Sequence, residues 1–303
     1  MAKQWKAHLA VFVANLLYGA NYSIAKEVMP TFIPPFGFIL IRVWIAAILF
    51  LITAQLFVKE KIQKEDRLRI FLCAVFGVAV NQLLFFKGLS LTSPINSGLM
   101  MVTNPVFVLM IPALFMGVKI SGRSILGICL GLSGALLLII FGSHYASNKE
   151  SSSLGDLFIL LNALSYAIYL IIVKPLMFKY HPITIMKVVF CWGAIMVLPF
   201  GIEQFTTIQW HTFETSTWLA TAFVVIGTTY FAYLFNTLAL RELSSNVVSV
   251  YIYLQPLLAA GFAMLLGKGS PNLIHLMAAV LIFSGVYLST TSGNKSKEEV
   301  SQA

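Results

Sequence analysis

Long apolar runs separated by short polar stretches extend over most of the chain, from about residue 7 to residue 291. Stretches such as 124–148 and 243–267 contain no Asp, Glu, Lys or Arg. They exceed the roughly 20 residues that cross a bilayer as a helix, and backbone groups in lipid must be hydrogen-bonded internally. The pattern therefore predicts membrane-spanning helices rather than buried strands. We expect ten of them, at 7–27, 34–57, 68–90, 94–116, 122–143, 154–176, 182–202, 215–238, 246–267 and 271–291.

The two halves of the chain resemble each other when the first is shifted by 147 to 151 residues. The matching pairs are Asn15 with Asn162, Tyr22 with Tyr169, Pro35 with Pro182, and Pro105 with Pro256. Because five helices is an odd number, two such halves lie in the membrane with opposite orientation, which is typical of secondary transporters. We therefore expect an all-α polytopic membrane protein with ten transmembrane helices as two inverted five-helix repeats, 1–147 and 148–291. A polar tail, 292–303, follows, and we expect it to be disordered.

Composition and charge agree with a membrane protein. Only 10% of the residues are charged and 59% are apolar, whereas soluble domains carry about 25% charged residues. This excludes a soluble enzyme, a disordered chain and a nucleic-acid-binding protein. With ten crossings, 14 of the 20 Lys and Arg residues fall on the side of the termini and 3 on the other side. Because positive residues favour the cytoplasmic side, we expect a multi-pass protein of the inner (cytoplasmic) membrane with both termini in the cytoplasm.

Three segments carry a resemblance to a known family. They are LLYGANYSIAK at 16–26, TNPVFVLMIPALFMG at 103–117 and LQPLLAAGFAMLLG at 254–267. Together with the two five-helix halves, they resemble the EamA-type members of the drug/metabolite transporter superfamily over about residues 7–291. The resemblance implies a central cavity and a secondary transporter that exports small metabolites or amino acids by alternating access, with some members importing. The Glu that often follows the closing Gly of the fourth and ninth helices is absent, since Val118 and Lys268 stand there.

Polar side chains recur at helical spacing inside the apolar runs. In the first run, Asn15, Tyr18 and Tyr22 lie at i, i+3 and i+7 and share one helix face. Such groups either line a cavity or bond neighbouring helices to one another. So many amides suit a cavity better than lipid or tight packing. The expected substrate-binding residues are Asn15, Tyr18, Tyr22, Arg42, Asn104, Tyr166, Tyr169, Tyr233, Asn236, Tyr251 and Gln255.

Arg42 is the most unusual of these residues. It lies about eight residues into the second run, roughly 12 Å from the outer end at 1.5 Å per residue, near the middle of a ~30 Å core. No Asp or Glu lies at that depth, so we expect backbone carbonyls, water or substrate as its partner. Arg binds a carboxylate with two parallel hydrogen bonds, which suits an amino acid or related organic anion. An arginine that snorkels outward, or that ties helix carbonyls together, is the structural alternative.

Two alternatives to an exporter remain at this stage, a membrane-embedded enzyme and an importer of the same fold. Intramembrane enzymes need clustered groups, such as paired aspartates or a Ser–His pair, whereas the five histidines are scattered singly. We therefore expect no enzymatic activity, no metal and no cofactor. The expected partners are a small-molecule substrate and the lipid bilayer, and no nucleic acid.

Small residues mark two of the runs as scaffold. Gly127 and Gly131 lie four residues apart in the run at 122–143, and Ala278 and Gly285 lie in the last run. Small residues at such spacing let helix backbones approach closely. We expect these residues to pack helices together rather than to bind a ligand.

Overall fold

The computed structural model describes residues 2–29, 31–92, 94–141, 152–258 and 273–301. Every regular element within these residues is a helix, so the described chain is all-α, as the apolar runs predict. The long regular helices are α1 (Ala2–Val28), α2 (Pro35–Phe57), α7 (Gly122–Phe141), α8 (Ser153–Val173), α10 (Pro182–Thr206) and α15 (Leu273–Ser301).

The helix α15 continues to Ser301, into the polar tail after residue 291 for which we expect disorder. The segment 295–299 consists of Lys, Ser and Glu residues. Lys and Glu are good helix formers, so a helix that has already formed in the apolar part extends through them at little cost.

Two of the expected helices contain π-helical turns, and their elements have the same order. The first consists of η1 (Lys64–Asp66), α3 (Arg67–Ala74), the π-helix η2 (Val75–Ala79) and α4 (Val80–Leu91). The second consists of α11 (Thr215–Ala222), the π-helix η5 (Phe223–Phe231) and α12 (Ala232–Glu242). π-helical turns are rare and occur frequently at functional sites, and residues beside both of these turns reach the cavity described below.

The helix expected at 94–116 is divided into α5 (Pro94–Met101) and α6 (Asn104–Met116). Pro105 is the second residue of α6, a position where the missing N–H of proline leaves no intrahelical bond unmade. The remaining short elements are α9 (Leu176–Lys179), η4 (Trp210–Thr212), α13 (Ser245–Val250) and η6 (Tyr251–Tyr253), and residues 254–258 are also helical. The rest of the helix expected at 246–267 lies outside the described residues.

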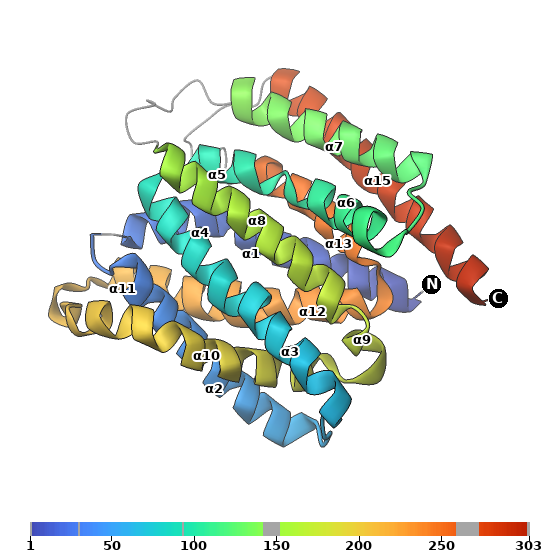
Figure 1. The fold of residues 1–303 in the computed structure, drawn as a ribbon. Helices are drawn as coiled ribbons and strands as arrows, with labels where there is room; N and C mark the ends of the chain where they lie inside the picture. Colours follow the sequence, from blue (N-terminus) through green and yellow to red (C-terminus); the bar gives the residue numbers. More distant parts are fainter. Residues whose placement is uncertain (1, 30, 93, 142–151, 259–272, 302–303) are drawn as a thin grey trace.

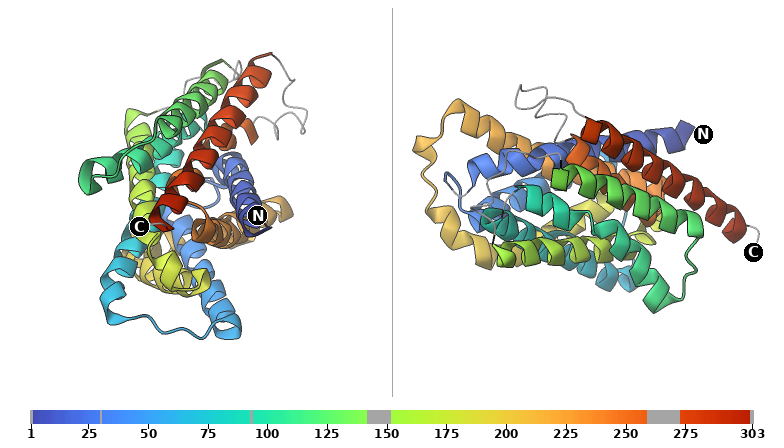
Figure 2. Two further views of the ribbon diagram at one scale, coloured as in Figure 1. Left: turned by 90° about the vertical axis from the view of Figure 1, so that its right-hand side faces the viewer. Right: turned by 90° about the horizontal axis from the view of Figure 1, so that it is seen from above.

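The long helices run roughly along one axis, from left to right in Figure 1. The N- and C-termini lie at the same end of this bundle, and both face the viewer in the left-hand view of Figure 2. The closest helix pairs are α7 with α15, α2 with α10, α4 with α8, and α1 with α12. The pair α7–α15 forms one flank of the bundle and α2–α10 the opposite flank, so the other two pairs lie between them.

Five helical stretches among the described residues have the length and hydropathy to cross a membrane. They are Pro35–Phe57, Lys64–Leu91, Ser153–Lys179, Pro182–Thr206 and Thr215–Glu242. Large apolar side chains such as Phe115, Leu56 and Leu276 are exposed on the bundle, as lipid-facing helices require. The fold is therefore that of a polytopic membrane protein.

The flank made by α7 and α15 depends on residues without side chains. A Cβ atom on Gly285 would lie 2.6 Å from the carbonyl oxygen of Gly127 and 2.6 Å from the backbone nitrogen of Gly131. Such contacts are shorter than atoms tolerate, so only glycine allows the two backbones to come this close. The predicted packing role of these glycines is confirmed.

Two lysines close helix ends in the same way. Lys26, near the end of α1, donates from Nζ to the carbonyls of Leu89 (3.1 Å) and Ser90 (3.4 Å) in the last turn of α4 and of Thr92 (3.1 Å) just after it. Lys174, directly after α8, donates to the carbonyls of Leu240 and Leu243 (2.7 Å to the latter), at the end of α12. Cations at a helix C-terminus bond its unpaired carbonyls and favour its dipole.

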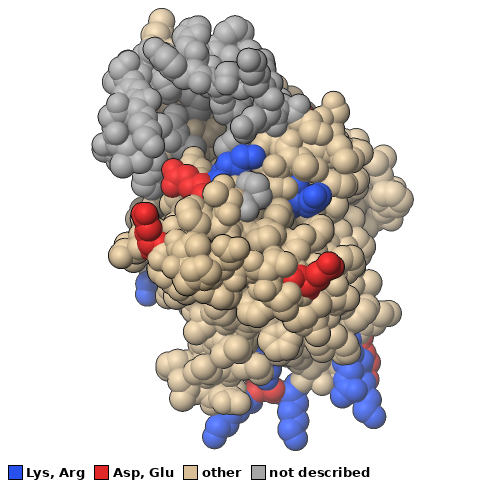
Figure 3. All heavy atoms as spheres, turned by 90° about the vertical axis from the view of Figure 1, so that its left-hand side faces the viewer, with Lys and Arg blue, Asp and Glu red and all other residues tan. Residues whose placement is uncertain are grey.

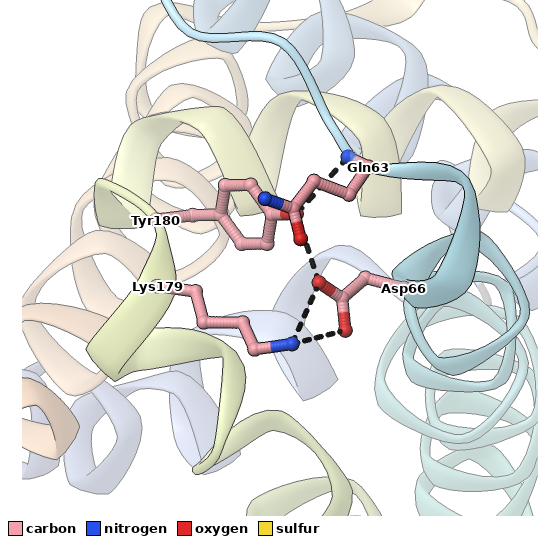
Figure 4. Close-up of polar contacts among 4 residues, drawn as sticks. All are labelled: Gln63, Asp66, Lys179 and Tyr180. Atoms are coloured by element: carbon pink, nitrogen blue, oxygen red, sulfur yellow. Dashed lines mark hydrogen bonds and ion pairs between the residues drawn. The ribbon is translucent and has the colours of Figure 1, made fainter.

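The two ends of the bundle differ in their polar side chains. Figure 3 views the bundle from the end opposite the termini, and on this face neutral side chains predominate and charged ones are scattered. At the other end, Asp66 accepts hydrogen bonds from Lys179 Nζ (3.0 Å) and from the Tyr180 hydroxyl (2.8 Å), and that hydroxyl accepts from the backbone N–H of Gln63 (3.0 Å) (Figure 4). This contact ties the segment before α3 to the segment after α8.

Candidate functional site

A cavity lies between helices of the two halves, lined by α1, α2, α4, α5, α8, α12, α13, η6 and the helical residues after η6. It offers about 60 Å³ to the centres of water-sized molecules, whereas one water needs roughly 10–15 Å³ by the same measure. The cavity therefore has room for several waters or for part of a small solute. A larger solute would require the surrounding helices to separate.

Most of the residues predicted to bind substrate meet at this cavity. They come from five different helical segments that are far apart in the sequence, as expected for a site between two halves. The predicted residues that line the cavity are Asn15, Tyr18, Tyr22, Arg42, Tyr166, Tyr233, Asn236 and Gln255.

The other three predicted residues are not among those that line the cavity. Asn104 donates from Nδ2 to the carbonyl of Ala163 (2.7 Å) and so bonds α6 to α8. Tyr169 is 2% exposed and packs directly over Gly77. The Tyr251 hydroxyl pairs with a ring nitrogen of His8 at 2.8 Å. In these positions, the hydrogen-bonding groups join helices or fill the core.

Arg42 is held inside the protein by neutral groups. Its side chain is 2% exposed, and its guanidinium donates from Nε to the Thr229 hydroxyl (2.8 Å) and from Nη2 to the Thr228 hydroxyl (3.2 Å). The ring of Phe86 lies beneath it, with 4.0 Å from Cζ to the ring centre, within cation–π distance. The arginine therefore neither snorkels to the surface nor bonds backbone carbonyls, and its two hydrogen bonds join α2 to η5.

One wall of the cavity contains a continuous series of hydrogen bonds between α1 and the segment after η6. Gln255 donates from Nε2 to Asn15 Oδ1 (2.8 Å) and accepts from the Tyr22 hydroxyl (3.0 Å). Asn15 in turn donates from Nδ2 to the carbonyl of Val11 (2.8 Å). Because both amide groups already make hydrogen bonds within the protein, their side chains are held in fixed orientations.

The opposite wall, on α4, α8 and α12, is less complete. Gln82 donates from Nε2 to the Tyr233 oxygen (2.6 Å), and the Tyr233 hydroxyl donates to the carbonyl of Gly77 (2.9 Å). Because that hydroxyl has only one proton, the amide nitrogen of Gln82 must face it, which leaves Gln82 Oε1 on the other side. Asn236 likewise donates from Nδ2 to the Tyr166 hydroxyl (3.0 Å).

Four cavity residues keep a buried polar atom that has no hydrogen-bond partner among the described residues. Most buried polar groups in native proteins are paired, so each exception is a candidate contact for a ligand. One of the four atoms is a nitrogen of a guanidinium cation, which donates hydrogen bonds, and the other three are amide oxygens, which accept them. The atoms are Arg42 Nη1, Gln82 Oε1, Asn162 Oδ1 and Asn236 Oδ1.

Arg42 carries the formal charge of the cavity, because the other side chains lining it are neutral. No group of three or more His, Cys, Asp or Glu side chains that would hold a metal ion occurs in the part of the chain that the structure describes. The groups that line the cavity are therefore one cation, several amides and phenols, and apolar side chains.

Sequence reasoning missed part of the lining. Asn81 and Gln82 interrupt an apolar stretch of α4, which is a signal that the sequence contains, but the two are adjacent and do not recur at helical spacing. Asn21 lies three residues after Tyr18 and next to Tyr22 on α1, so its spacing was a signal that was not used. The further lining residues are Asn21, Asn81, Gln82, Phe85, Phe86, Met101, Asn162, Val248 and Ile252.

Known proteins resemble this chain over nearly its full length. An uncharacterized transporter of Archaeoglobus fulgidus is 26% identical and covers 94% of this chain and 97% of its own length. The uncharacterized transporter YoaV of Bacillus subtilis is 27% identical, with 96% and 99% covered. A probable terminal-alkyne amino-acid exporter of Streptantibioticus cattleyicolor is 24% identical, with 83% and 82% covered.

A solved crystal structure shares the fold. It aligns with a TM-score of 0.73 over 95% of this chain and 98% of that chain, at 18% sequence identity. The model of the EamA-like transporter family matches residues 5–140 and again residues 153–291. The cavity is thus found in a membrane transporter, and the chain belongs to the EamA-like transporter family.

Proposed function

We propose that this protein is a secondary transporter that exports a small amino acid or a related organic anion across the cytoplasmic membrane by alternating access. The observation that carries the proposal is the guanidinium of Arg42, a cation inside the bundle with two nitrogens bonded to hydroxyls and Nη1 left over. A buried cation without an anionic partner is expensive in a membrane. A substrate carboxylate supplies the missing anion.

The remaining unpartnered atoms suit the other end of an amino acid. The amide oxygens of Gln82, Asn162 and Asn236 are acceptors without a partner among the described residues, and they are able to receive an ammonium group without adding a negative charge to the site. Phe85 and Met101 give the same cavity an apolar surface for a side chain. The printed name of the Streptantibioticus relative, a probable terminal-alkyne amino-acid exporter, supports this substrate class and this direction.

Symmetric contacts support the two inverted repeats, an arrangement found in many transporters that work by alternating access. Exchange of the two halves turns the pair α4–α8 into the pair α12–α1, and both pairs are among the closest in the bundle. Lys26 and Lys174 hold corresponding helix ends, and the π-helices η2 and η5 lie in corresponding helices. The two ranges matched by the family model fall within the proposed repeats 1–147 and 148–291.

We propose the cytoplasmic side for the end that carries both termini, on the basis of the 14 to 3 distribution of Lys and Arg. In a variant without native cysteines, single cysteines at Lys64 and Ser152 test this. An impermeant thiol reagent added to intact cells should label position 152 and spare position 64. The reverse labelling would contradict the orientation.

The substrate class is tested by counterflow in proteoliposomes with matched compounds. L-leucine carries both a carboxylate and an ammonium group, 4-methylpentanoate lacks the ammonium group, and isoamylamine lacks the carboxylate. We expect L-leucine to exchange fastest, 4-methylpentanoate to exchange more slowly and isoamylamine not to exchange. Exchange of isoamylamine alone would contradict an anion-binding site. Larger and smaller L-amino acids in the same assay then define the preferred side chain.

A further inference from the structure

We infer that Thr228 and Thr229 are positioning residues that fix the guanidinium of Arg42 so that Nη1 is the nitrogen presented to an anionic substrate. The inference rests on the proposed function for the substrate, but its geometric part stands on the contacts alone. Both threonines are fully buried, at 0% exposure, in the π-helix η5, and neither lines the cavity. Their contribution to the site therefore passes through the lining residues that they contact, Arg42 for both threonines and also Asn21 for Thr228.

The direction of each threonine hydroxyl is fixed by oxygen atoms that can only accept. The carbonyl of Val224 accepts from Thr228 Oγ1 (2.7 Å) and from Thr229 Oγ1 (3.0 Å), and Asn21 Oδ1 lies farther from Thr228 Oγ1, at 3.2 Å. A hydroxyl has a single proton, so once this proton faces one of these oxygens, only the lone pairs remain for Arg42. Both hydroxyl oxygens therefore accept hydrogen bonds from the guanidinium, which has only N–H donors to offer.

The π-helical turn explains how two adjacent threonines reach the same group. In a regular α-helix, residues i and i+1 do not face each other. A π-helix has a wider turn with i to i+5 bonds, and here neighbours Thr228 and Thr229 contact Nη2 and Nε of one guanidinium. The frame is completed by the Phe86 ring under Cζ.

The frame constrains the arginine without neutralising it. A carboxylate in place of the hydroxyls would satisfy Arg42 and compete with a substrate, whereas two hydroxyls and an aromatic face leave its positive charge in place. Nε and Nη2 are occupied and Nη1 is not. A ligand carboxylate therefore meets Nη1 of an arginine whose side chain is already fixed, so that less conformational freedom of Arg42 is lost when the ligand binds.

The test separates the geometry from the transport function. Protein labelled with ¹⁵N-arginine reports hydrogen exchange at Arg42 Nε–H, and the Arg42→Gln variant assigns that signal. Thr229→Val removes the hydroxyl and keeps the shape, and Thr229→Ser restores the hydroxyl. Thr221→Val is the matched control, since Thr221 is a buried threonine of α11 whose hydroxyl has no partner among the described residues.

We expect faster Nε–H exchange in Thr229→Val, with wild-type exchange in Thr229→Ser and in Thr221→Val. The half-saturation concentration for L-leucine counterflow should rise roughly 10-fold in Thr229→Val, and further in the double variant with Thr228→Val, because hydrogen bonds to a charged group are lost. The maximal rate should change less, since folding and helix motion are retained.

If Nε–H exchange is unchanged in Thr229→Val and in the double variant with Thr228→Val, the two threonines do not fix the guanidinium, whatever happens to transport. Faster exchange with unchanged L-leucine half-saturation would overturn the inference at its second step, because Arg42 would then be positioned for something other than substrate. Normal L-leucine transport by Arg42→Gln would locate the failure in the proposed function, whereas impaired transport by Arg42→Gln would locate it in the threonines.

Discussion

Arg42 and the lysine pair Lys26 and Lys174 are cations enclosed by helices, but they use their donors differently. Each lysine is half-buried at a helix end, and its ammonium bonds carbonyls that the end of a helix leaves unpaired. Arg42 lies in the middle of α2 at 2% exposure, and it bonds two hydroxyls while Nη1 keeps no partner among the described residues. The lysines complete the fold, whereas Arg42 remains ready for a further partner.

The comparison teaches how to separate structural from functional charge inside a helical membrane protein. Burial alone does not separate them, because a cation at a helix end is also shielded from water. The number of donors already used is the better criterion, since an unused donor in a low-dielectric site costs free energy until a ligand arrives. By this criterion, we expect substitution of Arg42, which has an unused donor, to have the largest effect. Substitution in the ion pair of Asp66 and Lys179, at the edge of the bundle, should have the smallest.

Replacement of Arg42 should have the largest effect on transport. Arg42→Gln removes the charge, and Arg42→Lys keeps the charge but loses the planar fork. We expect at least a roughly 30-fold loss of L-leucine counterflow in Arg42→Gln, as truncation of one member of a buried charge pair costs about 2–5 kcal/mol. Both variants should remain monodisperse in detergent. Aggregated protein in both would instead place Arg42 with the structural cations.

Replacement of Lys174 or Lys26 by Met should reduce stability and spare substrate binding. Loss of the charged bonds to the end of α12 or α4 should lower the free energy of unfolding by about 1–2 kcal/mol. The midpoint of thermal unfolding in detergent measures this, and Lys119→Met, at an exposed position, is the control. An unchanged midpoint together with a raised half-saturation concentration for L-leucine would reverse the comparison.

Two tyrosines one turn apart on α8 give a smaller contrast of the same kind. Tyr166 lines the cavity and accepts from Asn236, whereas Tyr169 is not among the residues that line it, and its hydroxyl lies 4.0 Å from the Met186 sulfur. Tyr166→Phe should weaken transport about fivefold, equivalent to one hydrogen bond of about 1 kcal/mol. Tyr169→Phe should transport normally. Equal losses in both variants would show that the cavity boundary is not the boundary of the site.

The sequence predicts the all-α fold and much of the cavity because both depend on regular patterns. Apolar runs define the helices, and the i, i+3, i+7 spacing of Asn15, Tyr18 and Tyr22 brings them to one face. All three line the cavity. The same spacing cannot tell which neighbour a face meets, and so Tyr169, whose mate Tyr22 lies in the cavity, packs over Gly77 instead.

The partners of Arg42 were unpredictable for a different reason. They lie in η5, where the chain leaves the 3.6-residue period on which helical spacing rests. Thr228 and Thr229 are adjacent in the sequence, so a search for residues on one helix face separates them. Composition also gives no warning, because threonine is common in membrane helices. Only the contact with a residue 186 or 187 positions away reveals their role.

The ion pair at the end with the termini should have the smallest effect. Asp66 is buried at 4% exposure, but the side chain of Lys179 is 50% exposed, and pairs with an exposed member contribute about 0.2–1 kcal/mol. Lys179→Met should therefore lower the unfolding midpoint slightly, and less in high salt because exposed charges are screened.

Asp66→Asn measured alone and combined with Lys179→Met gives the coupling between the two charges. Because the Tyr180 hydroxyl can still donate to the amide oxygen of the introduced asparagine in place of the carboxylate, Asp66→Asn should cost little more than Lys179→Met. A coupling larger than the loss in Lys174→Met would mean that the charges at the edge of the bundle hold the two halves together more strongly than the bonds at its helix ends. The expected order of effects, in which an unused donor marks the most important charge, would then fail, because Lys179 and Asp66 are already paired with each other.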